Sequence, residues 1–195
     1  MNFINLVWYK NGINYQINDI EKLLQFIKNI FKEKDVEYVC VGGSAGGYAA
    51  ILIGCLLNAK YVFCSDPQIC ISKFLSTLNK LEPYNHYLHN SYKNFRENIE
   101  NYKYNDLTNI IKNSITQIFY LFSSKSPLDN VQYELINNIS NIHILKYLSY
   151  AHGAFDKDVI PYLINLKFKD LIKLFDNNTL YKDLEDIQKR LKNID

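Results

Sequence analysis

Short apolar runs alternate with helical patterns along most of this chain. The apolar runs predict buried strands at residues 3–9, 36–41, 61–64, 115–122 and 142–148. The helical patterns predict helices at residues 20–31, 48–57, 131–138, 154–175 and 180–191. Continuous apolar strands that alternate with helices are typical of a parallel sheet with helices on both faces. The pattern therefore predicts an α/β protein with a three-layer α/β/α architecture and a mainly parallel sheet.

Two of these helices carry clear signatures. In the first, apolar residues recur at the spacing of one helix face, at Ile20, Leu23, Leu24, Ile27, Ile30 and Phe31. Asn18 or Asp19 can cap its N-terminus. The helix at residues 48–57 is apolar nearly all round, which predicts burial on every side.

The segment from about residue 69 to residue 113 interrupts this rhythm. It is polar, rich in tyrosine and mainly helical in pattern, and it shows no obvious strand. We interpret residues 1–195 as one domain in which this segment is a helical cap insertion over the carboxyl ends of the strands. Five of its tyrosines could line a sugar- or aryl-binding cleft, or simply pack with their hydroxyls in water: Tyr84, Tyr87, Tyr92, Tyr102 and Tyr104.

Composition and charge narrow the function classes. The 195 residues are 48% hydrophobic and 22% charged, which is the balance of a globular protein with a real core. The net charge is only +2, and the basic closing helices also carry Asp and Glu, so we expect no nucleic-acid partner. The four cysteines form no CxxC pair or Cys/His cluster, so we expect no metal, cofactor or disulfide framework.

The N-terminal residues 1–12 lack the basic start and long apolar stretch of a signal peptide. No apolar run approaches the ~20 residues that are needed to span a bilayer. We therefore expect a cytoplasmic protein without a membrane span.

A glycine-rich turn at residues 42–46, G-G-S-A-G, joins a predicted strand to a predicted helix. A serine on such a strand–turn–helix elbow sits in strained backbone geometry, and small neighbours let the strand and the helix pack closely. Its side chain then projects above the carboxyl edge of the sheet, which makes Ser44 a candidate nucleophile. Gly43 and Tyr48, on either side of Ser44, are candidate substrate contacts.

The residues of this turn do not fit two other glycine-rich loops. A Walker A loop needs Lys and then Ser or Thr after its last glycine, and Gly47 is followed by Tyr48 and Ala49. A dinucleotide fingerprint needs G-x-G-x-x-G, and with Gly42 as the first glycine Ser44 falls at the second. An anion-binding helix terminus without catalysis stays open as an alternative.

The elbow G-G-S-A-G-G-Y-A-A resembles that of the α/β-hydrolase superfamily, and most of all that of small esterases found beside bacterial surface-polysaccharide genes. The resemblance covers roughly residues 36 to 165, and its specific part is the elbow. It implies that an acid and then a histidine follow Ser44 in the chain to complete a catalytic triad. It also implies that the N–H of Ala45 is the first donor to the oxyanion.

Two residues meet this expectation at the ends of predicted strands. Asp129 lies in the loop after the strand at 115–122, and His152 lies in the loop after the strand at 142–148. Asp129 also begins a D-x-x-Q pattern with Gln132 and could cap the helix that follows. Asp66, after the strand at 61–64, is the alternative acid.

The chain departs from the superfamily pattern before the elbow. The loop that usually supplies a second oxyanion donor is missing, because only one strand and one helix precede the elbow strand. A misassigned start, a partner subunit that completes the sheet, or the Trp8–Gly12 segment beside the site would each account for this. We expect Trp8 and Tyr9 near the substrate. An uncovered edge strand at 3–9 would also allow a homodimer.

Three functions follow as hypotheses. The first is hydrolysis of an acyl ester, such as O-acetyl on a sugar or small metabolite, through an acyl-Ser44 intermediate. The second is acyl transfer by the same triad. The third is a catalytically silent member of this fold that serves as a binding or assembly module.

Overall fold

The computed structural model describes residues 14–32, 35–82, 99, 102–153 and 158–193. Two expectations fall outside these ranges: the strand at 3–9, and the Trp8–Gly12 segment with its expected substrate contacts Trp8 and Tyr9. Much of the predicted insertion, with Tyr84, Tyr87 and Tyr92, falls outside them as well.

The described residues contain a five-stranded sheet in which every neighbouring pair of strands is parallel. Its strands run in the order β1 (Val39–Gly43), β2 (Tyr61–Ser65), β3 (Gln117–Ser123), β4 (Ile142–Tyr147) and β5 (Asp176–Tyr181). The register places Gly43 beside Ser65 and Ser123 beside Tyr147. The loops that follow the first four strands therefore leave the sheet at one common edge, where ligands of open α/β sheets bind.

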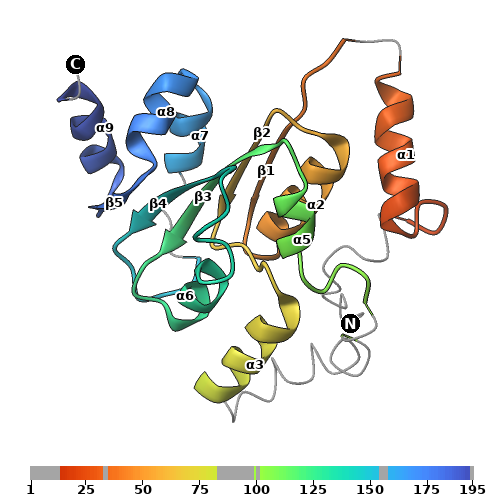
Figure 1. Cartoon of the computed structure of the whole chain (residues 1–195), viewed down its shortest axis with the longest axis horizontal. Helices are drawn as coiled ribbons and strands as arrows, with labels where there is room; N and C mark the ends of the chain where they lie inside the picture. Colours follow the sequence, from red (N-terminus) through yellow and green to blue (C-terminus); the bar gives the residue numbers. More distant parts are fainter. Residues whose placement is uncertain (1–13, 33–34, 83–98, 100–101, 154–157, 194–195) are drawn as a thin grey trace.

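Helices cover both faces of this sheet, which confirms the predicted three-layer α/β/α fold (Figure 1). Alternate residues of β3 show the two faces. Ile118, Tyr120 and Phe122 belong to one core with residues of α2 (Ala45–Leu57), α3 (Ile71–Leu81) and α5 (Thr108–Lys112). Phe119 and Leu121 belong to a second core with residues of α7 (Val159–Ile164), α8 (Phe168–Leu174) and α9 (Leu184–Lys192).

Two helices match their sequence signatures. The expected cap Asp19 begins α1 (Ile20–Ile30), and its Oδ1 accepts the N–H of Lys22 at 2.7 Å. Of the apolar face of α1, Ile20 and Leu23 are buried, whereas Ile30 is half exposed. As predicted, α2 is buried nearly all round. None of the helices in the described ranges is both long and apolar enough to cross a bilayer.

The C-terminal part differs from the prediction. The helix expected at 154–175 is two short helices, α7 and α8, and the start of the helix expected at 180–191 is instead the end of strand β5. This strand has the sequence D-N-N-T-L-Y, without a run of apolar residues. It is an edge strand of the sheet in the described residues, where it pairs with β4 across an irregular register. The tertiary pairing outweighs the weak local β-propensity of its asparagines.

The helix expected at 131–138 also begins earlier than predicted. It is α6 (Pro127–Tyr133), with proline in the first turn and Ser126 as its N-cap. Proline is favoured there because the first N–H groups of a helix have no intrahelical partner. In Figure 1, α3 and α6 lie toward the carboxyl ends of the strands.

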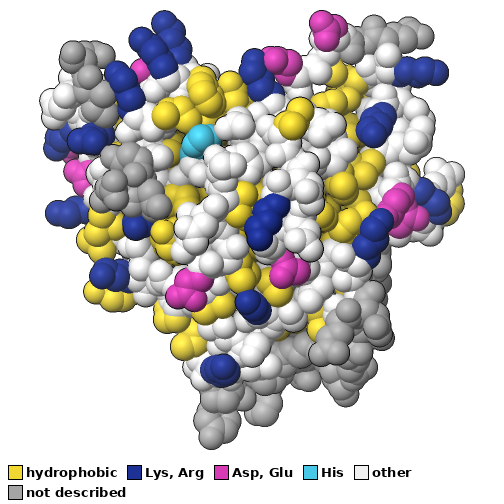
Figure 2. All heavy atoms as spheres, in the orientation of Figure 1, with side chains coloured by type: hydrophobic (Ala, Val, Ile, Leu, Met, Phe, Trp, Pro, Cys, Tyr) yellow, Lys and Arg dark blue, Asp and Glu magenta, His cyan; other side chains and the backbone are white. Residues whose placement is uncertain are grey.

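Figure 2 shows Lys and Arg side chains on both sides of this view, with fewer Asp and Glu side chains near them. In α9, Glu185 and Asp186 of the first turn accompany the basic residues of the last turn, and Lys189 Nζ lies 2.8 Å from Glu185 Oε1.

Candidate active site

Ser44 lies at the junction of β1 and α2 and has an unusual backbone conformation, with φ 51° and ψ −121°. Positive φ is rare for residues other than glycine, and it marks local strain that the surrounding structure must hold. The N–H of Ser44 donates to the carbonyl oxygen of Ser65 at 2.8 Å, which ties the turn to β2. The turn is the strand–turn–helix elbow that the sequence predicts.

The glycine at position 42 allows this elbow to close. A Cβ atom at Gly42 would collide with the backbone carbonyl group of Gly46 in the first turn of α2. Because those are backbone atoms, no side-chain rotation could relieve the overlap. Only glycine therefore lets β1 and α2 approach each other this closely.

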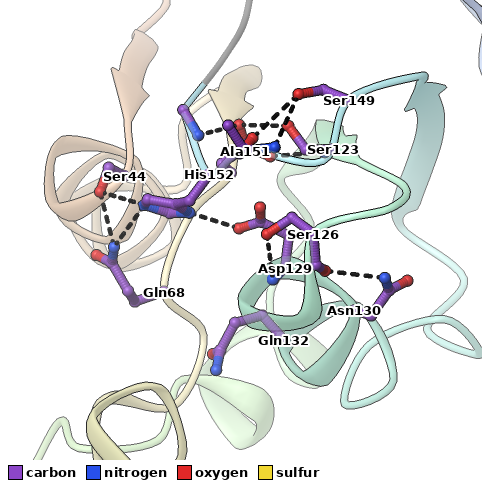
Figure 3. A network of polar contacts seen from close by, with 12 residues as sticks. Ser44, Gln68, Ser123, Ser126, Asp129, Asn130, Gln132, Ser149, Ala151 and His152 are labelled. Atoms are coloured by element: carbon purple, nitrogen blue, oxygen red, sulfur yellow. Dashed lines mark hydrogen bonds and ion pairs between the residues drawn. The ribbon is translucent and has the colours of Figure 1, made fainter. Parts of the chain in front are cut away.

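The structure brings the three predicted side chains into one hydrogen-bonded chain (Figure 3). Ser44 Oγ lies 2.8 Å from His152 Nε2, and His152 Nδ1 lies 2.6 Å from Asp129 Oδ1. The carboxylate of Asp129 can only accept, so Nδ1 carries the proton and Nε2 is the acceptor for the Ser44 hydroxyl. Ser44 directly follows β1, and His152 lies in the loop after β4, 108 positions further along the chain. Asp129 lies in the first turn of α6 and not in the loop where the sequence predicted it, because that helix begins at Pro127.

Asp129 is almost completely buried, with 1% of its surface exposed. It does not cap α6. Ser126 is the cap, and its Oγ accepts the N–H of Asp129 at 3.4 Å. The side-chain oxygen of Gln132 instead accepts the N–H groups of Ile69 and Cys70, each at 2.8 Å. The D-x-x-Q capping alternative is therefore wrong. Because Asp129 does not cap the helix, its carboxylate can accept the hydrogen bond from His152.

Asp66, the alternative acid, is fully buried, and its side-chain hydrogen bonds go to Ser123 and Gly153, whereas the imidazole Nδ1 pairs with Asp129. Asp66 Oδ1 accepts the N–H of Ser123 at 2.7 Å, and its Oδ2 accepts the Ser123 hydroxyl at 3.1 Å and the N–H of Gly153 at 2.9 Å. Asp66 thus links the loop after β2 to the end of β3 and to the residue that follows His152.

Charge and burial set the proton affinities in this cluster. Burial raises the pKa of Asp66 to about 6, and the neighbouring charge of Asp129 acts in the same direction. For His152, burial lowers the pKa, but the hydrogen bond and charge of Asp129 outweigh it, and Asp66 adds to their effect. The net pKa of His152 is raised above its ordinary value of 6.5.

Gln68 is a site residue that the sequence interpretation missed. Its Nε2 donates to Ser44 Oγ at 2.8 Å and lies 3.5 Å from His152 Nε2, and only 1% of the residue is exposed. Figure 3 shows its amide pointing toward both residues. The one available signal was its position in the loop just after β2, at the edge where Ser44 emerges.

The described part of the predicted insertion reaches the site through α3. The ring of Phe74 lies 5.5 Å from the imidazole of His152, centroid to centroid, and Phe74 is buried. The two described tyrosines of the insertion do not line a cleft there. Tyr104 is buried in the core, and the ring of Tyr102 packs edge-on against it at 6.0 Å.

The predicted substrate contacts have different surroundings. Gly43 is exposed beside Ser44, as a substrate contact requires. Tyr48 has no exposed surface, and its hydroxyl donates to the carbonyl oxygen of Tyr104 at 2.8 Å. The prediction that Tyr48 contacts the substrate is therefore wrong, because the all-round burial of α2 places Tyr48 in the core. The N–H of Ala45 belongs to the first residue of α2.

Within the described ranges, no group of three or more His, Cys, Asp or Glu side chains is placed to hold a metal ion.

No protein-family model matches the chain, and no curated protein matches it. Among solved structures, it is similar to the capsule O-acetyltransferase of Neisseria meningitidis serogroup A. The likeness has 19% identity and a TM-score of 0.47, and it covers 95% of this chain and 66% of that chain.

A variant of the same enzyme in complex with CoA shows 21% identity over 80% of this chain and 64% of that chain, with a TM-score of 0.47. The form in complex with caged gadolinium shows 20% identity and a TM-score of 0.46 over 78% and 64% of the two chains. This chain thus spans slightly less than two thirds of the length of these neighbours.

Proposed function

We propose that this protein is a serine-dependent acyl-transferring enzyme that moves a small acyl group, such as acetyl, onto a hydroxyl of a sugar through an acyl-Ser44 intermediate. The observation that carries the proposal is the chain of hydrogen bonds from Asp129 through His152 to Ser44. A hydroxyl becomes a strong nucleophile when an oriented base accepts its proton, and this arrangement supplies both base and orientation.

In the first step, His152 Nε2 takes the proton of the Ser44 hydroxyl while Oγ forms a bond to the acyl carbon of the donor. The carbonyl oxygen becomes an oxyanion, and we assign the N–H of Ala45, the first residue of α2, as one of its hydrogen-bond donors. Asp129 stabilises the imidazolium through Nδ1. When the tetrahedral intermediate collapses, the bond to the donor's alcohol or thiol breaks, and that group leaves with the proton from His152.

In the second step, His152 accepts the proton of an incoming hydroxyl, whose oxygen bonds to the acyl carbon. The bond to Ser44 Oγ then breaks, and the proton returns to Ser44. A sugar hydroxyl as acceptor makes the reaction a transfer, and water makes it a hydrolysis. Phe74 against the imidazole supports transfer, because apolar cover limits the access of water to the acyl-enzyme.

The acceptor class rests on two further considerations. The elbow resembles that of esterases associated with surface-polysaccharide genes, and the solved neighbours act as capsule O-acetyltransferases. The identities are near 20% and the TM-scores are below 0.5, so these neighbours serve only to choose the first acceptors to test.

The test is trapping of the acyl-enzyme. The protein is incubated with an activated acetyl ester and, separately, with an acetyl thioester, and its intact mass is measured. We expect a mass gain of one acetyl group that Ser44→Ala abolishes and that the surface variant Ser140→Ala retains. Chase with sugar acceptors should then release the acetyl group onto carbohydrate faster than water does.

Two results would count against the proposal. Absence of acylation in a folded wild-type protein with every donor would favour the catalytically silent alternative. Acylation that is followed only by hydrolysis, with no sugar acceptor accelerating the loss, would establish an esterase instead.

A further inference from the structure

We propose that Gln68 is a catalytic residue whose side-chain amide is the second hydrogen-bond donor to the oxyanion. The inference rests on the acyl-Ser44 chemistry proposed above and adds a group to it. Its basis is the 2.8 Å hydrogen bond from Gln68 Nε2 to Ser44 Oγ, the atom that attacks the acyl carbon.

The orientation of the amide follows from its neighbours. Asp129 accepts from His152 Nδ1, so Nε2 of the imidazole accepts the Ser44 proton. The remaining capacity of Ser44 Oγ is that of an acceptor, and only the NH₂ end of Gln68 can fill it. The same NH₂ end lies 3.5 Å from His152 Nε2, where a carbonyl oxygen would meet another acceptor. A donor therefore points into the reaction centre.

The position of this donor suits the oxyanion. In the tetrahedral intermediate, the oxyanion and Ser44 Oγ are bonded to the same carbon, so they lie closer together than a hydrogen-bond length. A donor that reaches Oγ in the free enzyme needs only a small rotation to reach the oxyanion. Its acceptor then changes from a neutral hydroxyl to an anion, and charge-assisted hydrogen bonds are about twice as strong. This difference between ground state and transition state is what accelerates a reaction.

The backbone around Gln68 is held from both sides. Two residues before it, Asp66 accepts hydrogen bonds from Ser123 and Gly153. Immediately after it, Ile69 and Cys70 donate to Gln132 of α6, three residues beyond Asp129. The segments that carry Asp129 and His152 thus also fix the loop that carries Gln68. Oxyanion donors act strongly when the fold holds them in place before the reaction begins.

A side-chain donor also complements the backbone donor of the elbow. The N–H of Ala45, the first residue of α2, is one candidate donor, and Gln68 adds a second from another loop. Side-chain amides serve as oxyanion donors in unrelated serine enzymes, so the chemistry has precedent. Gln68 lies three residues after the end of β2, and its side-chain amide reaches Ser44 Oγ.

The test compares Gln68→Met and Gln68→Ala with the wild type. Methionine has a similar length to glutamine and retains the packing, but it has no N–H donor. Steady-state rates are measured with an activated acetyl ester, and inhibition constants are measured with a small alkyl boronic acid, whose tetrahedral adduct with serine imitates the oxyanion. The matched control is Gln117→Met, because Gln117 is the first residue of β3 and lies at the edge of the sheet away from the site.

We expect kcat/KM to fall about 10²- to 10³-fold in both Gln68 variants, mainly through kcat, which is the usual loss of one oxyanion donor. Binding of the boronic acid should weaken by a similar factor in both Gln68 variants. Gln117→Met should match the wild type in both measurements. If Gln68→Met keeps wild-type rates, or raises KM without lowering kcat, the proposal is overturned although acyl-Ser44 chemistry stands. If the wild type forms no acyl-enzyme, both proposals are overturned.

Discussion

Asp66 Oδ2 accepts the backbone N–H of Gly153 at 2.9 Å, which joins the loop after β2 to the residue that follows His152. The carboxylate that sequence interpretation kept as an alternative acid therefore supports the loop of the histidine. Burial lowers the pKa of His152, but the hydrogen bond and charge of Asp129 raise it by more. The negative charge of Asp66 raises it further. Asp66 acts on the imidazole through position and charge.

The first prediction concerns pH. His152 must be neutral to take the Ser44 proton, and its pKa is raised, so acylation should decline as pH falls, with a midpoint above 6.5. In Asp66→Asn, one negative charge that stabilises the imidazolium is removed, and this midpoint should move to lower pH. The measurement is the rate of labelling by a fluorophosphonate as a function of pH.

The control for this shift is Glu134→Gln, which removes an exposed carboxylate at the end of α6. Its midpoint should match that of the wild type. A midpoint that moves upward in Asp66→Asn would contradict the electrostatic role given to Asp66.

The second prediction concerns Asp129. In Asp129→Asn, the amide can no longer select the Nδ1-protonated imidazole or balance its positive charge. We expect acylation of Ser44 to slow by about 10⁴-fold, which is the loss seen when the triad acid of a serine protease is changed to Asn. Rapid-quench measurement of the acyl-enzyme checks this, with circular dichroism to show that the variant is folded. A loss of less than tenfold would remove Asp129 from the triad.

The third prediction concerns the elbow. In Gly42→Ala, the new Cβ meets the backbone carbonyl group of Gly46, and β1 and α2 must separate. We expect the free energy of unfolding to fall by about 1–3 kcal/mol, as for other overpacked sites. Urea denaturation measures it. Gly43→Ala is the matched control, because its nearest contact is the Ser65 hydroxyl at 2.9 Å, which can rotate away. Equal losses in both variants would contradict the packing explanation.

The fourth prediction concerns Phe74. In Phe74→Ala, a buried ring beside His152 is removed, so we expect the free energy of unfolding to fall by about 3–5 kcal/mol. Burial lowers the pKa of His152, and relief of burial should move the pH midpoint of labelling upward, opposite to Asp66→Asn. Phe168→Ala, on the other face of the sheet and 43% exposed, should cost less and leave the midpoint unchanged. A downward shift in Phe74→Ala would contradict this assignment.

Local patterns were enough for part of this protein. The apolar runs at 61–64, 115–122 and 142–148 predict β2, β3 and β4 because the middle residues of each strand are apolar and are buried against helices on both faces of the sheet. The failure at β5 has the opposite cause. Its polar sequence forms a strand because its backbone pairs with the edge of the sheet at β4. Pairing of this kind depends on the backbone, so the local spacing of apolar residues does not predict it.

The elbow could also be predicted from the sequence, because its constraint is local: Gly42 and Gly46 lie four residues apart and contact each other. The loops of Asp66, Asp129 and His152 could be predicted to share one edge, because parallel strands end together. Two features of the site depend on the directions of side chains that follow different strands. One is which of the two acids contacts His152, and the other is the contact of Gln68 with Ser44. Only the tertiary structure decides those, since no local spacing encodes where separate loops converge.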